Sequence, residues 1–175
     1  MVITLVGYRA TGKTTVGTLL AEKLGWEFYD IDPEIERRGK KSIAAMFAED
    51  GEPFFREIET AVLEDQLIRD RVVVSTGGGT VLKDRNRELM RDGGPVVWLQ
   101  ARVETIQSRM AGDPGTALNR PSLTGTDPLQ EVPGVLATRT PYYEQVATIA
   151  VPVDSATPRQ IVSEILSLLP PEVTA

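Results

Sequence analysis

The chain has 175 residues, a net charge of −6, and 41% hydrophobic and 25% charged residues. This length suits one globular domain, and an acidic balance without a long basic run argues against nucleic acid as a partner. The sequence contains no cysteine and no histidine, which excludes disulfides, thiolate catalysis and the most common general base. Acid–base chemistry therefore falls to carboxylates, lysine or tyrosine, and any metal is expected to be a hard, oxygen-bound ion such as Mg²⁺.

No apolar stretch approaches the roughly 20 residues that a membrane-spanning helix needs. The first residues also lack a basic segment followed by a cleavable apolar one. We therefore expect a cytoplasmic protein with no membrane partner. Because no large apolar stripe stands out, we also expect a monomer.

The first motif is a glycine-rich loop after the apolar run 2–6. The stretch GYRATGKTT, residues 7–15, has the spacing G-x-x-x-x-G-K-[ST] at Gly7, Gly12, Lys13 and Thr14. In such loops backbone N–H groups face phosphate oxygens, the lysine reaches the β and γ phosphates, and the hydroxyl ligates Mg²⁺. The motifs D-x-x-G and N-K-x-D of GTPases are absent, and the chain is small for a motor. The pattern predicts the nucleotide site of a small-molecule kinase.

The next segment, WEFYDID, predicts a strand that ends at an acidic pair. Residues two apart in a strand face the same way, so Asp30 and Asp32 are expected on one side. One carboxylate could act on Mg²⁺, directly or through water, and the other could accept a hydrogen bond from an attacking hydroxyl. Asp32 before Pro33 is equally typical of a helix N-cap.

Two further motifs have a functional and a purely structural interpretation. In GEPFFREIE, Arg56 and Glu59 lie three apart on a predicted helix. They form either a surface ion pair or an arginine held by a carboxylate so that it can bind an anionic substrate. In VVVSTGGG, the glycines 77–79 follow a buried strand and indicate either a tight turn or a close approach of a ligand to the backbone. Ser75 and Thr76 stand where P-loop proteins usually carry an acidic residue, which suggests a water-mediated metal contact.

The remaining elements are predicted, in chain order, as a helix around Arg85–Arg91, a strand at 95–100, a helix at 102–111, a strand at 147–153 and a helix from Pro158. Strands that alternate with helices predict an α/β protein with a five-stranded parallel sheet between two helical layers. Ligands bind such sheets beyond the carboxyl ends of the strands. We expect a single domain, residues 1–170, and a frayed tail at 171–175.

The stretch from 111 to 128 is rich in Gly, Pro, Thr and Asp, which predicts a mobile lid at about 111–126. Arg120 lies in this lid, where an arginine could reach the γ phosphate during transfer. A solvated loop arginine is the alternative. Arg139 is a surface residue by default.

Taken together and in this order, the motifs resemble those of shikimate kinase, a family of P-loop kinases with a nucleoside-monophosphate-kinase-like fold. The resemblance runs from Gly7 to about Leu168. Its elements are the P-loop, D-x-D at Asp30 and Asp32, GExxFRxxE at 51–59, TGGG at 76–79, RP-L at 120–123 and R-x-P-x-Y at 139–143. The P-loop alone is general to a superfamily, whereas the combination is specific.

The resemblance implies ATP-dependent phosphorylation of the 3-hydroxyl of shikimate, which yields shikimate 3-phosphate and ADP on the way to chorismate and the aromatic amino acids. It implies catalytic roles for Lys13, Asp32 and Arg120, and metal contacts for Thr14 and Asp30. The implied shikimate contacts are Asp32, Arg56, Gly78, Gly79 and Arg139. The implied ATP contacts are Gly7, Ala10, Thr11, Gly12, Lys13, Thr14, Thr15, Arg109, Arg120 and Pro158.

Two features depart from the family pattern. Arg9 and Thr11 occupy the middle of the P-loop, where many members have small or apolar residues, and Arg9 adds a charge of unknown role. The segment before Arg120 is longer than usual, which makes the adenine role of Arg109 the least secure of the implied roles. The alternatives are a gluconate or nucleoside monophosphate kinase and a non-catalytic nucleotide-binding module. The arginine pair and the triple glycine favour an acceptor that carries a carboxylate and hydroxyls.

Overall fold

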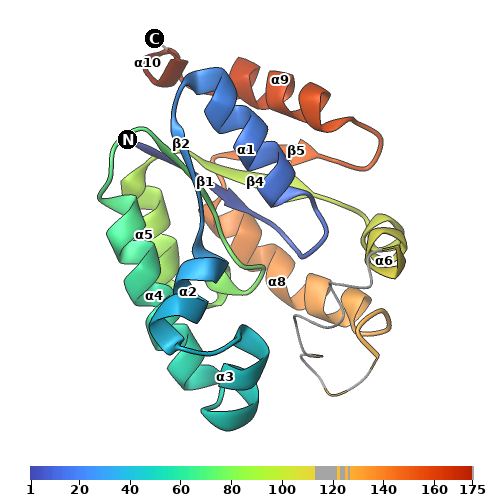
Figure 1. The fold of residues 1–175 in the computed structure, drawn as a ribbon. Helices are drawn as coiled ribbons and strands as arrows, with labels where there is room; N and C mark the ends of the chain where they lie inside the picture. The colour runs from blue at the N-terminus through green and yellow to red at the C-terminus, as the bar shows by residue number, and fades with distance from the viewer. Residues whose placement is uncertain (113–121, 123–124, 126, 175) are drawn as a thin grey trace.

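The structure, a computed structural model, describes residues 1–112, 122, 125 and 127–174 (Figure 1). The described residues contain one sheet of five strands in the order β2-β3-β1-β4-β5, and every pair of neighbouring strands is parallel. The predicted α/β architecture is confirmed. The predicted lid and its Arg120 lie mainly outside the described residues.

The strands are β1 (Val2–Val6), β2 (Glu27–Asp30), β3 (Val72–Ser75), β4 (Val96–Gln100) and β5 (Ile149–Pro152). The α-helices are α1 (Lys13–Leu24), α2 (Ile31–Gly39), α3 (Ile43–Glu49), α4 (Glu52–Leu67), α5 (Asp84–Gly93), α6 (Val103–Ala111), α8 (Val132–Val146), α9 (Pro158–Leu168) and α10 (Pro171–Thr174). A short 3₁₀ turn, η1 (Thr80–Leu82), follows the triple glycine. Ser42 caps α3, and Gly25 ends α1 with a positive φ of 66°.

The sheet separates two apolar layers because successive strand residues point to opposite faces. In the central strand β1, Val2 and Val6 face one core cluster, and Ile3 and Leu5 face the other. Helices α1 and α9 cover the second face, and α4, α5 and α8 cover the first (Figure 1). A sheet buried on both faces explains why the central strands are apolar almost throughout.

The chain end differs from the expected frayed tail. Pro171–Thr174 form α10, and Val173 is only 4% exposed in the core cluster beneath α1 and α9. Burial of the Val173 side chain stabilises this short helix. The prolines at the start of the tail gave no sign of this burial in the sequence. None of the helices in the described part of the chain has the length and hydropathy to span a membrane.

Parallel strands bring their carboxyl ends to one edge. Val6 leads there into the P-loop, Asp30 ends β2, and Ser75 leads into the triple glycine. Because β3 lies between β1 and β2, these three segments are neighbours. The edge therefore gathers the predicted functional segments.

Candidate active site

The P-loop folds tightly between β1 and α1. Gly7 has a φ of 147°, and a Cβ atom there would lie 2.7 Å from the carbonyl oxygen of Leu99, so the position requires glycine. Gly12, at a φ of 92°, leads into α1. The Lys13 ammonium curls back over the loop and donates to the carbonyls of Gly7 and Tyr8, each at 2.8 Å. The loop thus holds its lysine beside the positive end of α1, where anions bind.

Asp30, rather than Asp32, caps α2. Its Oδ1 accepts from the backbone N–H of Asp32 at 3.1 Å, and its Oδ2 accepts from the Thr14 hydroxyl at 2.9 Å. The helix begins at Ile31, so the predicted cap was wrong by two residues and the same-face argument for a strand does not apply. Thr14 and Asp30 nevertheless place two oxygen donors side by side at the end of β2.

A hollow beside the P-loop is lined by six of the residues predicted to contact ATP, namely Ala10, Thr11, Gly12, Thr15, Arg109 and Pro158. The guanidinium of Arg109 donates to the carbonyls of Ala10, at 3.2 Å, and of Val153, at 2.8 Å, so it bridges the P-loop and the segment after β5. Arg109 therefore lies beside the P-loop, and its role at the adenine stays a prediction. The lining residues are Ala10, Thr11, Gly12, Thr15, Val16, Arg109, Ala156, Pro158 and Ile161.

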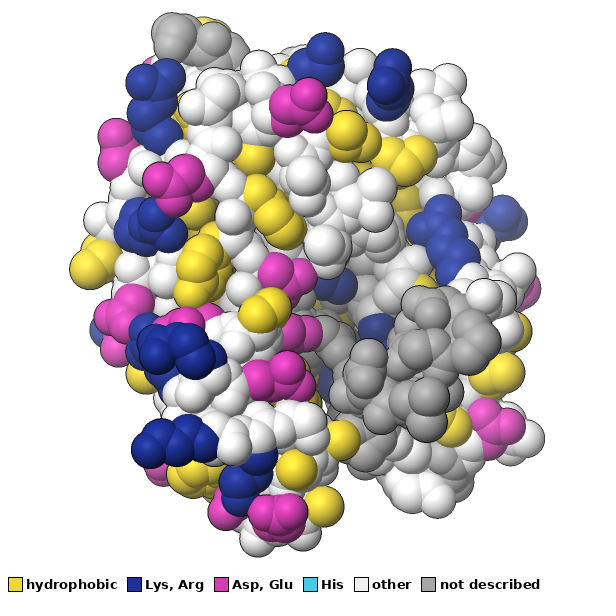
Figure 2. All heavy atoms as spheres, viewed as in Figure 1, with side chains coloured by type: hydrophobic (Ala, Val, Ile, Leu, Met, Phe, Trp, Pro, Cys, Tyr) yellow, Lys and Arg dark blue, Asp and Glu magenta, His cyan; other side chains and the backbone are white. Residues whose placement is uncertain are grey.

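A second hollow lies between the P-loop, the triple glycine and the helices α2, α3 and α4. Figure 2 shows a hollow on this face, with Lys or Arg side chains at its floor and Asp or Glu side chains along one rim. It is lined by Arg9, Asp32, Ile43, Phe47, Phe55, Arg56, Glu59, Gly77, Gly78, Gly79 and Arg139. All five residues predicted to contact the acceptor lie in this pocket.

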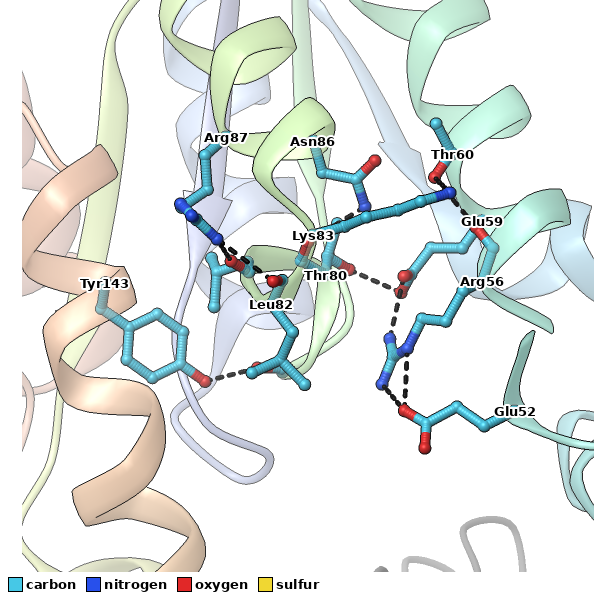
Figure 3. Close-up of polar contacts among 12 residues, drawn as sticks. Glu52, Arg56, Glu59, Thr60, Thr80, Leu82, Lys83, Asn86, Arg87 and Tyr143 are labelled. Carbon is cyan, nitrogen blue, oxygen red and sulfur yellow. Dashed lines mark hydrogen bonds and ion pairs between the residues drawn. The ribbon is translucent and has the colours of Figure 1, made fainter.

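Arg56 is held by two carboxylates on its own helix (Figure 3). Its Nη1 donates to Glu59 at 2.8 Å, and its Nε and Nη2 donate to Glu52 at 3.1 and 3.0 Å. The Glu59 side chain is 1% exposed and also accepts from the Thr80 hydroxyl at 2.7 Å. Of the two interpretations, the surface ion pair is thus wrong, because the pair lies within the pocket wall.

The triple glycine makes room for both arginines. A Cβ atom on Gly79 would lie 2.5 Å from Nη2 of Arg56, and one on Gly78 would lie 3.2 Å from Nη1 of Arg139. The Tyr143 hydroxyl donates to the Gly78 carbonyl at 2.6 Å and fixes the turn from the side of α8 (Figure 3). The glycines therefore permit close packing of guanidinium groups on the backbone.

Arg139 differs from Arg56 in its charge balance. It is only 7% exposed, so the expectation of a surface residue was wrong, and among the described residues it has no ion pair or hydrogen bond. Its guanidinium lies 5.7 Å from the ring centroid of Tyr8, whose pKa burial raises, so that the ring is neutral. A buried cation without a carboxylate partner is costly, and an anionic ligand would compensate it.

Sequence reasoning missed the apolar wall of the pocket. One side of the pocket is lined by Ile43, Phe47 and Phe55, and the ring centroids of the two phenylalanines lie 4.7 Å apart. Helical periodicity assigns Phe55 to the core, and it is indeed buried, but periodicity cannot tell a core face from a pocket wall. Arg9 and Glu59 also line the pocket. The predicted catalytic Arg120 lies outside the described residues.

The arrangement has counterparts among known proteins. A family model described as shikimate kinase matches residues 9–170. The chain belongs to the shikimate kinase family. A shikimate kinase of Oleidesulfovibrio alaskensis is 49% identical over 145 residues, which are 83% of this chain and 84% of that protein. The structure of the Acinetobacter baumannii shikimate kinase in complex with shikimate matches with a TM-score of 0.88 and 40% identity, over 95% of this chain and 91% of that one.

A gluconokinase of Sinorhizobium meliloti matches with a TM-score of 0.64 at 21% identity, over 95% of this chain and 89% of that one, and shows the shared fold alone. Membership of the shikimate kinase family establishes ATP-dependent phosphorylation of shikimate, on the pathway to chorismate and the aromatic amino acids. Family membership also argues against the two alternatives from the sequence, which were a gluconate or nucleoside monophosphate kinase and a non-catalytic nucleotide-binding module.

Proposed function

We propose that this chain transfers the γ-phosphoryl group of ATP to the 3-hydroxyl of shikimate, with the two hollows as its ATP and shikimate sites. The observation that carries the proposal is the pocket beside the P-loop. It combines the buried cation of Arg139, which has no ion pair or hydrogen bond in the described part of the chain, with the carboxylate of Asp32 and an apolar wall. Such a pocket matches a small cyclic acid that carries hydroxyl groups.

In this proposal Arg139 and Arg56 bind the carboxylate of shikimate, and the backbone at Gly78 and Gly79 lines the bound ring. Asp32 accepts the hydrogen bond of the 3-hydroxyl and orients it toward the P-loop. Fixed guanidinium groups suit this role because bidentate hydrogen bonds to a carboxylate set orientation as well as affinity. Phosphoryl transfer depends mainly on positioning and electrostatics, so the absence of histidine is no obstacle.

The backbone of Gly7 to Gly12 and the Lys13 ammonium would bind the phosphates, and Arg109 and Pro158 would contact the adenine. For the lysine this requires exchange of its two carbonyl acceptors for phosphate oxygens. From the family resemblance we assign Arg120 to the γ phosphate. The P-loop backbone, Lys13 and Arg120 supply N–H donors or positive charge where the phosphate groups carry negative charge.

The donor set fits Mg²⁺ as the metal of the ATP complex. The Thr14 hydroxyl and the Asp30 carboxylate are adjacent hard oxygen donors. The described residues contain no group of three or more acidic side chains that could hold a metal on their own, so phosphate oxygens and water would supply the other ligands. When bound, Mg²⁺ neutralises charge on the phosphates.

We further propose a cytoplasmic monomer, supported by the acidic composition and by the small number of large exposed apolar residues in the described part of the chain, namely Met1, Phe54, Ile68 and Leu168. Size-exclusion chromatography with light scattering tests the monomer.

One assay tests the reaction. ADP release from Mg·ATP is followed with shikimate, gluconate, AMP, CMP or no acceptor. We expect turnover with shikimate only, and a product whose phosphate is on the 3-hydroxyl by ³¹P and ¹H NMR. Equal turnover with gluconate or a nucleotide, or ADP release that does not depend on the acceptor, would contradict the proposal.

A further inference from the structure

Arg9 occupies an unusual place for a P-loop residue. It lies between the two motif glycines, yet its side chain lines the pocket of Asp32, Arg56 and Arg139 and not the hollow of Arg109 and Pro158. The residue is only 6% exposed. Its charge is therefore directed to the acceptor side of the loop.

One half of the Arg9 guanidinium is anchored and the other half is not. Nη2 donates to Oε1 of Glu131 at 2.9 Å, and the Glu131 side chain is fully buried. The other carboxylate oxygen, Oε2, accepts from the Ser122 hydroxyl at 2.9 Å. Nη1 of Arg9, in contrast, is buried and makes no hydrogen bond of normal geometry among the described residues, and the same holds for the Tyr8 hydroxyl, whose pKa the neighbouring Arg9 acts to lower against the effect of burial. A buried donor of this kind lowers stability unless a ligand or water accepts from it.

The anchoring also couples Arg9 to Arg139. Glu131 is the N-cap residue of α8, the helix that carries Arg139 about two turns later. Both guanidinium groups lie over the Tyr8 ring, at 5.8 Å from its centroid for Arg9 and 5.7 Å for Arg139. One helix and one aromatic ring thus set the positions of both cations.

We propose that Arg9 is a further substrate-binding residue, whose Nη1 donates to the carboxylate of the bound acceptor beside Arg139. This inference rests on the proposed acceptor site. We favour the carboxylate over the transferred phosphate as the ligand of Arg9. The reason is that Arg9 lines the same pocket as Arg139 and does not line the nucleotide hollow. Glu131 keeps the guanidinium in place while leaving one nitrogen for the ligand.

The test measures shikimate binding by titration calorimetry and steady-state KM values for Arg9→Met, Arg9→Lys and Glu131→Gln. The matched control is Arg69→Met, because Arg69 also lies 5.8 Å from a tyrosine ring and pairs with a glutamate, at the amino end of β2. Each protein is also titrated with shikimate methyl ester, which lacks the negative charge, and with shikimate 3-phosphate.

For Arg9→Met we expect the shikimate Kd to rise about tenfold or more, with the ATP KM within twofold of wild type. The loss should shrink to twofold or less with the methyl ester, which a merely structural role of Arg9 would not produce. Arg9→Lys and Glu131→Gln should give intermediate losses, so they test the idea even if Arg9→Met does not fold. Arg69→Met should bind shikimate normally.

Three results would overturn the inference: an unchanged shikimate Kd, an equal loss for acid and ester, or a loss confined to shikimate 3-phosphate. A failure of the proposed function is distinguishable from these, because wild-type protein would then show no shikimate-dependent ADP release.

Discussion

Arg56 and Glu59 form an ion pair on one turn of α4, with 2.8 Å between Nη1 and Oε2, and the carboxylate of the pair is almost completely buried. Glu59 also accepts from Thr80, directly after the triple glycine, so it joins α4 to the turn beneath the pocket. Arg56 keeps its orientation because the Glu59 carboxylate that it contacts is itself held by the Thr80 hydroxyl. The second partner, Glu52, is 54% exposed and adds a weaker support.

This asymmetry predicts different effects of two similar substitutions. Glu59→Ala leaves Arg56 and Thr80 without a buried partner, and removal of one member of a buried pair costs about 3–5 kcal/mol. We expect a Tm lower by several degrees and a raised shikimate KM. Glu52→Ala, at an exposed pair, should cost less than about 1 kcal/mol. Thermal unfolding and kinetics of both variants check this, and equal destabilisation by the two would contradict it.

The triple glycine offers a steric test. Gly79→Ala places a Cβ atom 2.5 Å from the Arg56 guanidinium, which must then shift away from its place. We expect the shikimate KM to rise about tenfold, as for loss of one charged hydrogen bond, with little change in the ATP KM. Gly77→Ala is the control, because its Cβ atom would have its nearest neighbours at 3.4 Å, an ordinary contact. Similar kinetics for Gly79→Ala and wild type would show that Arg56 does not fix the acceptor.

Local pattern and motif were enough to predict a five-stranded parallel sheet between two helical layers, because apolar runs and turn residues act locally. The same information could not show whether the ion pair of Arg56 is exposed or buried. It also could not show that Arg139 is buried. Those properties depend on what packs over a residue from elsewhere in the chain.

Two further positions, the cap of α2 and Arg9, show the same limit at finer scale. Asp30 and Asp32 are both good capping residues, and only the register of β2 decides that Asp30 meets the free N–H groups of α2. Arg9 belongs to the P-loop in sequence, but its guanidinium points to the acceptor pocket. It does so because Glu131, 122 residues later in the chain, accepts its hydrogen bond. No local pattern contains that partner.

Arg139 should affect acceptor affinity more than turnover. Replacement by alanine removes a buried cation that contacts the Tyr8 ring but has no ion pair or hydrogen bond among the described residues, so the protein should lose little stability or gain some. Hydrogen bonds to charged groups are worth about 1.5–3 kcal/mol, so we expect the shikimate KM to rise about ten- to a hundredfold. Arg37→Ala, at a side chain that is 71% exposed, is the control. An unchanged shikimate KM would remove Arg139 from the site.

The helix that carries Asp32 should weaken in acid. Hydrogen bonds from Arg37 and Arg38 lower the pKa of Glu34 from 4.5 to about 2. A carboxyl group whose pKa is lower in the folded state contributes stability above its unfolded pKa and loses it as the pH falls through the folded value. The contribution should therefore be complete above pH 4.5 and vanish toward pH 2.

Glu34→Gln tests this relation. The urea midpoints at pH 7 and pH 3 should differ less for the variant than for wild type. High salt should reduce this difference between the two proteins, because Arg37 is exposed and its ion pair is screened. Parallel pH profiles of the two proteins would contradict the role of Glu34.

Asp32 is the residue whose chemistry can be separated from its structural role. Asp32→Asn keeps the shape of the side chain and removes its charge, whereas α2 remains capped by Asp30. If Asp32 accepts the hydrogen bond of the attacking hydroxyl, kcat should fall about a hundredfold or more, the range for loss of a general base. Neither the ATP KM nor the Tm should change much. Asp65→Asn, at an exposed partner of Arg38, should retain full kcat. A kcat of Asp32→Asn within threefold of wild type would mean that positioning and charge at the P-loop suffice without this carboxylate.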